Sequence, residues 1–231
     1  MSVLTMVRKL LLPLAAAIGF IFGENVMAIE EPGFERLEKI ENFEIRQYRP
    51  VVVAETFVDG DLSSASNIGF RRIADYIFGN NRSMLGTVSK PSEKIAMTAP
   101  VLVEPVERSE KIAMTAPVSV EPQGDSASGV MQSNRWRVQF TMPSEYSKAT
   151  LPTPVNPEVS LRDVPGKRFA VNVFSGFSGE ERVQQKIDEL FVWLDGKNIK
   201  SIGAPQLARY NPPWTLPFWR RNEILVEIAA P

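Results

Sequence analysis

A shift of 117 residues, which carries Phe57 onto Phe174, lays the first half of this chain on the second half without a gap. Each half contains a run rich in β-branched and aromatic residues, followed by an amphipathic segment that ends at a glycine. The runs are residues 43–58 and 169–174, and the amphipathic segments are residues 61–79 and 179–196. This internal duplication constrains the fold, because both copies must bury equivalent apolar faces.

The local patterns predict the same elements in both halves. Residues 43–48 alternate and are separated from 51–57 by Pro50, which indicates two short strands or one bent strand. Asp61 and the two serines that follow it are N-cap candidates for a helix that reaches Phe78. In the second half, the pattern predicts a strand over 169–174 and a helix over 179–194.

The shift also carries Thr98-Ala99-Pro100 onto Thr215-Leu216-Pro217, and each half ends in a predicted strand, 136–142 and 224–228. Two amphipathic helices with glycine stops could align by chance, but the Thr-x-Pro match lies outside the helices. We therefore interpret the pattern as a duplicated β-α-β-β unit. It predicts a single α+β domain, in which one antiparallel sheet or barrel carries two helices on its outside.

A second, shorter repeat is nearly perfect. Residues 92–105 recur at 109–122, and the only difference is Ser119 in place of Leu102. Two copies cannot build a solenoid, which needs about three or more units. The 117-residue shift aligns the first copy with the second half, so we interpret the second copy as an insertion. Residues 123–134, rich in Gly, Ser, Asp and Gln, are typical of a surface loop.

The composition excludes several classes of function. The chain has 0 Cys and 0 His, which excludes thiolate chemistry and removes the commonest general base and metal ligand. Its formal net charge is −1 with both signs well mixed, so no basic patch indicates a nucleic-acid partner. Carboxylate chemistry and small-molecule binding remain.

The N-terminus is typical of a secretory signal peptide over residues 1–28. Arg8 and Lys9 precede the apolar run 10–22, and Val26-Met27-Ala28 offers small residues for cleavage before Ile29. The run is shorter than the roughly 20 residues that a membrane-spanning helix needs. We expect an exported, periplasmic domain of residues 29–231. The alternative is an uncleaved anchor, which would make the membrane a partner.

Four segments resemble the SOUL haem-binding protein family. They are Lys94 to Val101 (KIAMTAPV), Tyr76 to Asn81, Trp136 to Pro143 and Tyr210 to Phe218, and the last continues through Arg220 to Ile224. The resemblance covers roughly residues 31–229 with its motifs in the family's order. It implies a distorted antiparallel β-barrel with two flanking helices. It also implies binding of haem or related tetrapyrroles in an apolar surface groove, beside the first helix and beneath an adjoining loop.

By position, the resemblance places the binding residues on the first helix and the following loop. The implied wall is Phe70, Ile73, Ala74 and Ile77, with Met84 or Leu85 on the loop, and Arg71 or Arg72 pairing with the propionates. Each role has an alternative. The spacing of Ile73 and Ile77 is equally typical of a core face, and the two arginines are of a type that normally stays in water.

The chain departs from the family in one respect. One branch is thought to use a histidine as axial iron ligand, and this chain has none. We therefore expect haem or porphyrin to bind without strong axial coordination and predict no metal site. Substitutes would be Tyr76, Met84, Met97 or a lysine.

Three functions remain in competition. The first is an exported, non-enzymatic carrier or buffer of haem or a related tetrapyrrole. The second is a module of the same fold for another amphipathic small molecule, since bacterial regulators of similarly duplicated architecture bind drugs. The third is an enzyme that uses carboxylates such as Glu55 or Glu223. No paired-carboxylate motif or phosphate-binding loop in the sequence supports this hypothesis.

Overall fold

The computed structural model describes residues 29–82, 92–105, 133–212 and 214–229. Nine strands of this part form one antiparallel sheet in the order β1-β2-β9-β11-β10-β5-β6-β3-β8. They are β1 (Phe34–Ile40), β2 (Phe43–Tyr48), β3 (Val51–Asp59), β5 (Val101–Pro105), β6 (Arg135–Thr141), β8 (Ser160–Val164), β9 (Arg168–Ser175), β10 (Gln206–Arg209) and β11 (Arg221–Glu227). A separate pair joins β4 (Asn81–Arg82) to β7 (Thr153–Pro154).

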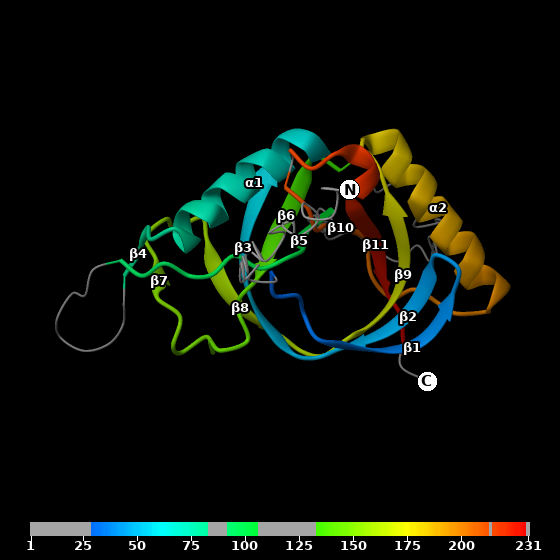
Figure 1. Cartoon of the computed structure of the whole chain (residues 1–231), viewed down its shortest axis with the longest axis horizontal. Coiled ribbons are helices and arrows are strands. Elements are labelled where there is room, and N and C mark those ends of the chain that lie inside the picture. Colours follow the sequence, from blue (N-terminus) through cyan, green and yellow to red (C-terminus); the bar gives the residue numbers. More distant parts are fainter. Residues whose placement is uncertain (1–28, 83–91, 106–132, 213, 230–231) are drawn as a thin grey trace, which may run out of the picture.

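The sheet is curled into a half-barrel, and both helices lie on its outside (Figure 1). Helix α1 (Leu62–Ile77) follows β3 and contacts β3 and β6, whereas α2 (Glu180–Gly196) follows β9 and contacts β9 and β11. The strand order β3-β6-β5 in one half mirrors β9-β11-β10 in the other, and the halves meet where β5 pairs with β10. This symmetry confirms the predicted α+β fold built from a duplicated β-α-β-β unit.

The Thr-x-Pro segments are not equivalent in the fold, although the 117-residue shift aligns them. Thr98-Ala99-Pro100 leads directly into β5, whereas Thr215-Leu216-Pro217 lies between β10 and β11 and continues into the 3₁₀-helix η2 (Pro217–Trp219). The reason is that 23 residues (78–100) connect α1 to β5 but only nine (197–205) connect α2 to β10. The duplication therefore holds for the elements and not for these connections.

Helix α1 begins where the sequence predicts. The carboxylate of Asp61 accepts hydrogen bonds from the backbone N–H groups of Ser63 and Ser64, both at 2.9 Å, and so satisfies two donors of the first turn. The helix then lies very close to the sheet at Gly69, where a Cβ atom would fall 2.5 Å from Val138 of β6. No helix of the described residues is long and apolar enough to cross a membrane.

Two short connections almost close the half-barrel. Arg49 and Pro50 join β2 to β3, and residues 165–167 join β8 to β9, so both connections run between the two ends of the sheet. They are fastened together, because the N–H of Tyr48 donates to the carbonyl of Lys167 at 2.8 Å. The approach is close: a Cβ on Gly166 would lie 2.9 Å from the carbonyl oxygen of Tyr48. The two connections therefore lie directly against each other.

Candidate functional site

The inner face of the half-barrel carries buried charges from β2 and β11. The guanidinium of Arg46 binds both carboxylate oxygens of Glu223, at 2.8 and 3.1 Å, and its Nε donates to Glu44 at 2.7 Å. The hydroxyl of Tyr210 also donates to Glu223, at 2.6 Å. Burial alone would raise the pKa of Glu44, but Arg46 and its neighbouring cations lower that pKa overall. This group is a satisfied structural network.

A second charged network lies on β3, β5, β6 and β8. The guanidinium of Arg162 binds Glu55 through Nη2 at 2.8 Å and through Nε at 3.0 Å, and Arg137 pairs with Glu104. Gln206 donates to the same Glu104 carboxylate at 2.6 Å. Glu55 and Glu223, the carboxylates of the enzyme hypothesis, are therefore both bound by arginines.

Between these networks the inner face is hollow. A trough of about 280 Å³ is bordered by Tyr48 and Tyr210 on one side and by Arg137 and Arg162 on the other. Apolar side chains from several strands line its floor; they are Val51, Val53, Leu102, Phe169 and Leu225. The trough thus combines apolar side chains with two arginines, Arg137 and Arg162, that already pair with Glu104 and Glu55.

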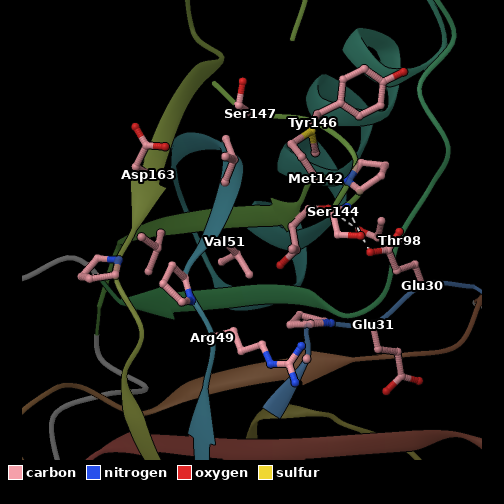
Figure 2. A pocket seen from close by; sticks show the side chains of 18 residues that line it. Glu30, Glu31, Arg49, Val51, Thr98, Met142, Ser144, Tyr146, Ser147 and Asp163 are labelled. Carbon is pink, nitrogen blue, oxygen red and sulfur yellow. Dashed lines mark hydrogen bonds between the residues drawn. The ribbon is translucent and has the colours of Figure 1, made fainter. Parts of the chain in front are cut away.

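A larger pocket of about 710 Å³, here called the rim pocket, opens at the nearly closed end of the half-barrel (Figure 2). Its walls come from the segment before β1, the β2–β3 turn, the start of β3, and the ends of β6 and β8. The rim pocket and the trough share six lining residues: Pro32, Arg49, Val51, Thr141, Val164 and Pro165. The two hollows are therefore adjoining parts of one site.

Arg49 is the uncommitted cation of this site. Its guanidinium makes no ion pair or side-chain hydrogen bond with any residue that the structure describes, and Figure 2 shows it beside the rim pocket. The neighbouring Lys167, by contrast, pairs with Glu227. The stem of Arg49 lies beside Gly33, where an added Cβ would be 3.4 Å from Cδ of Arg49. An anionic group entering the pocket would find a guanidinium that no described residue pairs with.

The acidic residues of the rim pocket differ in their hydrogen bonds and ion pairs. Glu30 accepts a hydrogen bond from the N–H of Ser144 at 3.0 Å, and Glu31 pairs with Arg221. Asp163 is exposed and lies away from Arg49 in Figure 2. The described residues contain no group of three or more acidic side chains arranged to hold a metal ion. Among the residues that the structure describes, the pocket thus leaves the guanidinium of Arg49 and the carboxylate of Asp163 without an ion pair or side-chain hydrogen bond, at separate places.

The structure places three of the residues implied by the resemblance in the core. Ile73 and Ile77 are 0% exposed and Ala74 is 6% exposed, because this stripe of α1 packs against β3 and β6. A buried core face is the alternative that the helical spacing of Ile73 and Ile77 also predicts. None of the three lines the rim pocket or the trough.

The remaining residues of that group lie on the accessible side of α1 or outside the described residues. Phe70 is 37% exposed and its ring lies 5.4 Å from that of Phe140. Arg71 is exposed, whereas Arg72 pairs with Glu158 at 3.1 Å and donates to the carbonyl of Phe57. Met84 and Leu85 lie outside the described residues. Their ligand-binding role stays a prediction.

The structure describes two of the residues suggested above as substitute iron ligands, Tyr76 and Met97. The hydroxyl of Tyr76 donates to the carbonyl of Pro152 at 2.9 Å, and the side chain is 1% exposed. Met97 is half-buried in the segment before β5. The rim pocket itself offers Met142, which is 3% exposed, and Tyr146, whose hydroxyl donates to Glu93.

Sequence reasoning missed Arg49 and the rim pocket. The pocket is assembled from five segments that are distant in sequence, so periodicity within one element cannot reveal it. One signal was present: the Arg49-Pro50 pair between two predicted strands marks a turn, and turns commonly carry binding residues.

Comparison with protein families gives one match, to the model described as SOUL heme-binding protein, over residues 29–109 and 105–227. The two matched segments overlap near the junction of the short repeat and together span the described domain. A search of curated protein sequences found no significant match.

Solved structures resemble the fold at low sequence identity. The C-terminal domain of EcmrR matches with a TM-score of 0.53 and 10% identity, covering 82% of this chain and 98% of that one. An uncharacterized conserved protein from Listeria innocua matches at 0.53 and 8% identity, covering 81% and 92%. A hydrolase from the same organism matches at 0.50 and 9% identity, covering 84% and 94%. These likenesses concern the fold alone.

Proposed function

The chain belongs to the SOUL heme-binding protein family, and on that premise we propose that it binds haem or a related tetrapyrrole, without catalysing a reaction, in the rim pocket. The observation that carries the choice of site is the guanidinium of Arg49, which pairs with no described residue, at the edge of a pocket of about 710 Å³. A pocket of this size falls within the range of small-molecule sites, about 300–1,000 Å³.

The chemistry of the pocket suits a flat apolar disc that carries carboxylates at one edge. Val51, Val164 and the prolines around them offer apolar contact to the macrocycle, and each buried Å² contributes roughly 25 cal/mol. Arg49 offers two parallel N–H donors to a propionate, in the geometry that guanidinium and carboxylate share. The trough gives the pocket further apolar depth toward Leu102.

Iron contributes little to this binding. The rim pocket presents no imidazole or thiolate, since the chain has neither His nor Cys, and the hydroxyl of Tyr146 is already hydrogen-bonded to Glu93. Apolar contact and the Arg49–carboxylate pair are common to haem and to metal-free protoporphyrin. The two ligands are therefore expected to bind with similar affinity, and a large preference for haem would show that an iron ligand is present.

A set of variants tests the site. Arg49→Ala removes one charge-assisted interaction and is expected to weaken binding of hemin by about tenfold or more. Arg182→Ala, an exposed arginine on α2, is the matched control and should leave the affinity unchanged. The double variant Phe70→Ala/Arg72→Ala tests the helix face implied by the family resemblance. If it weakens binding and Arg49→Ala does not, the tetrapyrrole lies on α1.

We place this binding outside the cytoplasm, as a carrier or buffer of the ligand. Support comes from the sequence of residues 1–28, with its cations, apolar run and small residues before Ile29. Intact-mass analysis of the protein from a periplasmic fraction should give a chain that begins at Ile29. A full-length chain recovered only with the cytoplasm would contradict export.

A further inference from the structure

Five exposed apolar side chains gather around η2. Exposure is 83% for Trp214, 69% for Trp219, 67% for Phe177, 64% for Phe218 and 49% for Leu216. We call these residues the aromatic patch. Single exposed apolar residues are ordinary, and Phe78, Val192 and Ile202 are examples here. A cluster that contains two tryptophans and two phenylalanines is not ordinary, because proteins rarely leave so much contiguous aromatic surface in water.

The aromatic patch is held in place by the fold. The rings of Phe218 and Trp219 lie 5.0 Å apart, and the N–H of Trp219 donates to the carbonyl of Leu216 at 2.9 Å. The guanidinium of Arg220 donates to the carbonyl of Thr215 at 2.8 Å and lies 5.4 Å from the ring of Phe177. These contacts connect the loop before α2 to the segment between β10 and β11. The ring pair of Phe218 and Trp219 and the ring of Phe177 are therefore held by contacts within the domain.

Close to the first described residue, the chain contacts β11 next to this patch. Glu31 pairs with Arg221, which starts β11 two residues after η2 ends. The apolar run 10–22 therefore lies only a few residues from this point along the chain. Six residues separate Phe22 from Ile29, and an extended chain of that length spans about 20 Å. When the run enters a membrane, before or without cleavage, this short connection keeps the domain close to the bilayer.

We propose that the aromatic patch docks the protein on the surface of a phospholipid bilayer. Tryptophan and phenylalanine are the side chains that favour the boundary between headgroups and acyl chains, and an arginine beside them can contact phosphate. The nearby charges are mixed, since Glu180 and Glu181 begin α2 close to Phe177 while Arg220 and Arg221 follow η2. Insertion of the apolar side chains therefore drives docking, and a membrane of zwitterionic lipids is sufficient for it.

Tryptophan fluorescence in the full-length chain tests the proposal with phosphatidylcholine vesicles that carry brominated acyl chains. In the Trp193→Phe variant, the emitting residues are Trp136, Trp214 and Trp219, and we expect strong quenching by the brominated lipid. In the Trp214→Phe/Trp219→Phe variant, only Trp136 and Trp193 emit. We expect little quenching there, although residues 10–22 still tether the chain. Equal quenching of the two variants would overturn the proposal.

A second pair of variants tests the affinity. Trp214→Ala/Phe218→Ala/Trp219→Ala should lower the fraction of protein that sediments with vesicles. Phe78→Ala/Val192→Ala/Ile202→Ala, three exposed apolar residues elsewhere, should not. Equal sedimentation of the two triple variants contradicts docking through the patch. Trp214 and Trp219 emission that is already blue-shifted without vesicles, and insensitive to brominated lipid, also contradicts it. That result would show that a protein segment covers the patch.

Discussion

Arg46 has two acidic partners on the inner face and is 4% exposed, while Glu223 is 1% exposed. Removal of one partner of a buried pair leaves an uncompensated charge, which costs about 3–5 kcal/mol. Arg46→Ala should therefore lower the free energy of unfolding by about that amount in urea titrations. Arg36→Ala is the control, because Arg36 also binds Glu44 but its side chain is 48% exposed. A loss of about 0–1 kcal/mol is expected for the control.

Glu44 gives the same network a pH dependence. Its folded-state pKa lies below the ordinary value of 4.5, so its contribution to stability is complete above that pH and is lost as the pH falls. Glu44→Gln should therefore be less stable than the wild-type protein at neutral pH, and the difference should shrink below pH 4.5. Urea unfolding across that range measures the difference. A difference that stays constant with pH would show that ionised Glu44 does not stabilise the fold.

At the scale of residues, sequence reasoning succeeded where one element determines the environment. Of the N-cap candidates Asp61, Ser63 and Ser64, the structure selects Asp61, whose carboxylate accepts from the backbone donors two and three residues away. The environment of Ile73 depends on whether the stripe on α1 packs inward or borders a groove, and the helical period fits both. Arg49 was missed because its freedom from partners depends on where five distant segments meet.

At the scale of elements, the contact at Gly69 shows how closely α1 packs on the sheet. A Cβ there would fall 2.5 Å from Val138, and the neighbouring atoms belong to a branched side chain that is 0% exposed. Gly69→Ala should therefore destabilise the protein by about 1–3 kcal/mol through overpacking, despite the better helix propensity of alanine. Gly196→Ala at the end of α2 is the control, because no atom lies within 4 Å of the added Cβ. Thermal unfolding of both variants gives the comparison.

Elements were more predictable than their connections. Alternation and helical period located β2, β3, α1, β9 and α2, since each is defined by contacts repeated along its own length. The prediction that the two Thr-x-Pro segments are equivalent was wrong, because a shared tripeptide sets local backbone geometry and not topology. Whether Thr215 leads into a strand or lies between two strands depends on the length of the preceding connection, which a fixed shift ignores.

At the scale of the whole molecule, we expect the second copy of the short repeat to be dispensable for folding. Its second copy, 109–122, lies outside the described residues, but β5 and β6 are antiparallel neighbours and Pro105 pairs with Trp136. Deletion of residues 106–122 leaves 123–134 to join two strand ends that already meet, and hairpin loops need about two to five residues. We expect a cooperative thermal transition in the deletion variant. Its loss would show that the second copy is part of the fold.

The architecture could be predicted from the sequence, because the duplication and the order of amphipathic strands and helices leave few ways to bury the apolar faces of both halves. The rim pocket did not follow, since it depends on how far the sheet curls and on two connections that lie against each other at Tyr48 and Lys167. Sheet curvature arises from twist accumulated over many strands, and local patterns do not encode its extent.

An absorbance titration of the protein with hemin at neutral pH tests the central claim most directly. The proposal predicts a shifted Soret band that saturates at about one equivalent, as expected for a single pocket. A spectrum that matches free hemin with an inert protein, at every ratio, would contradict tetrapyrrole binding and assign the rim pocket to another amphipathic ligand.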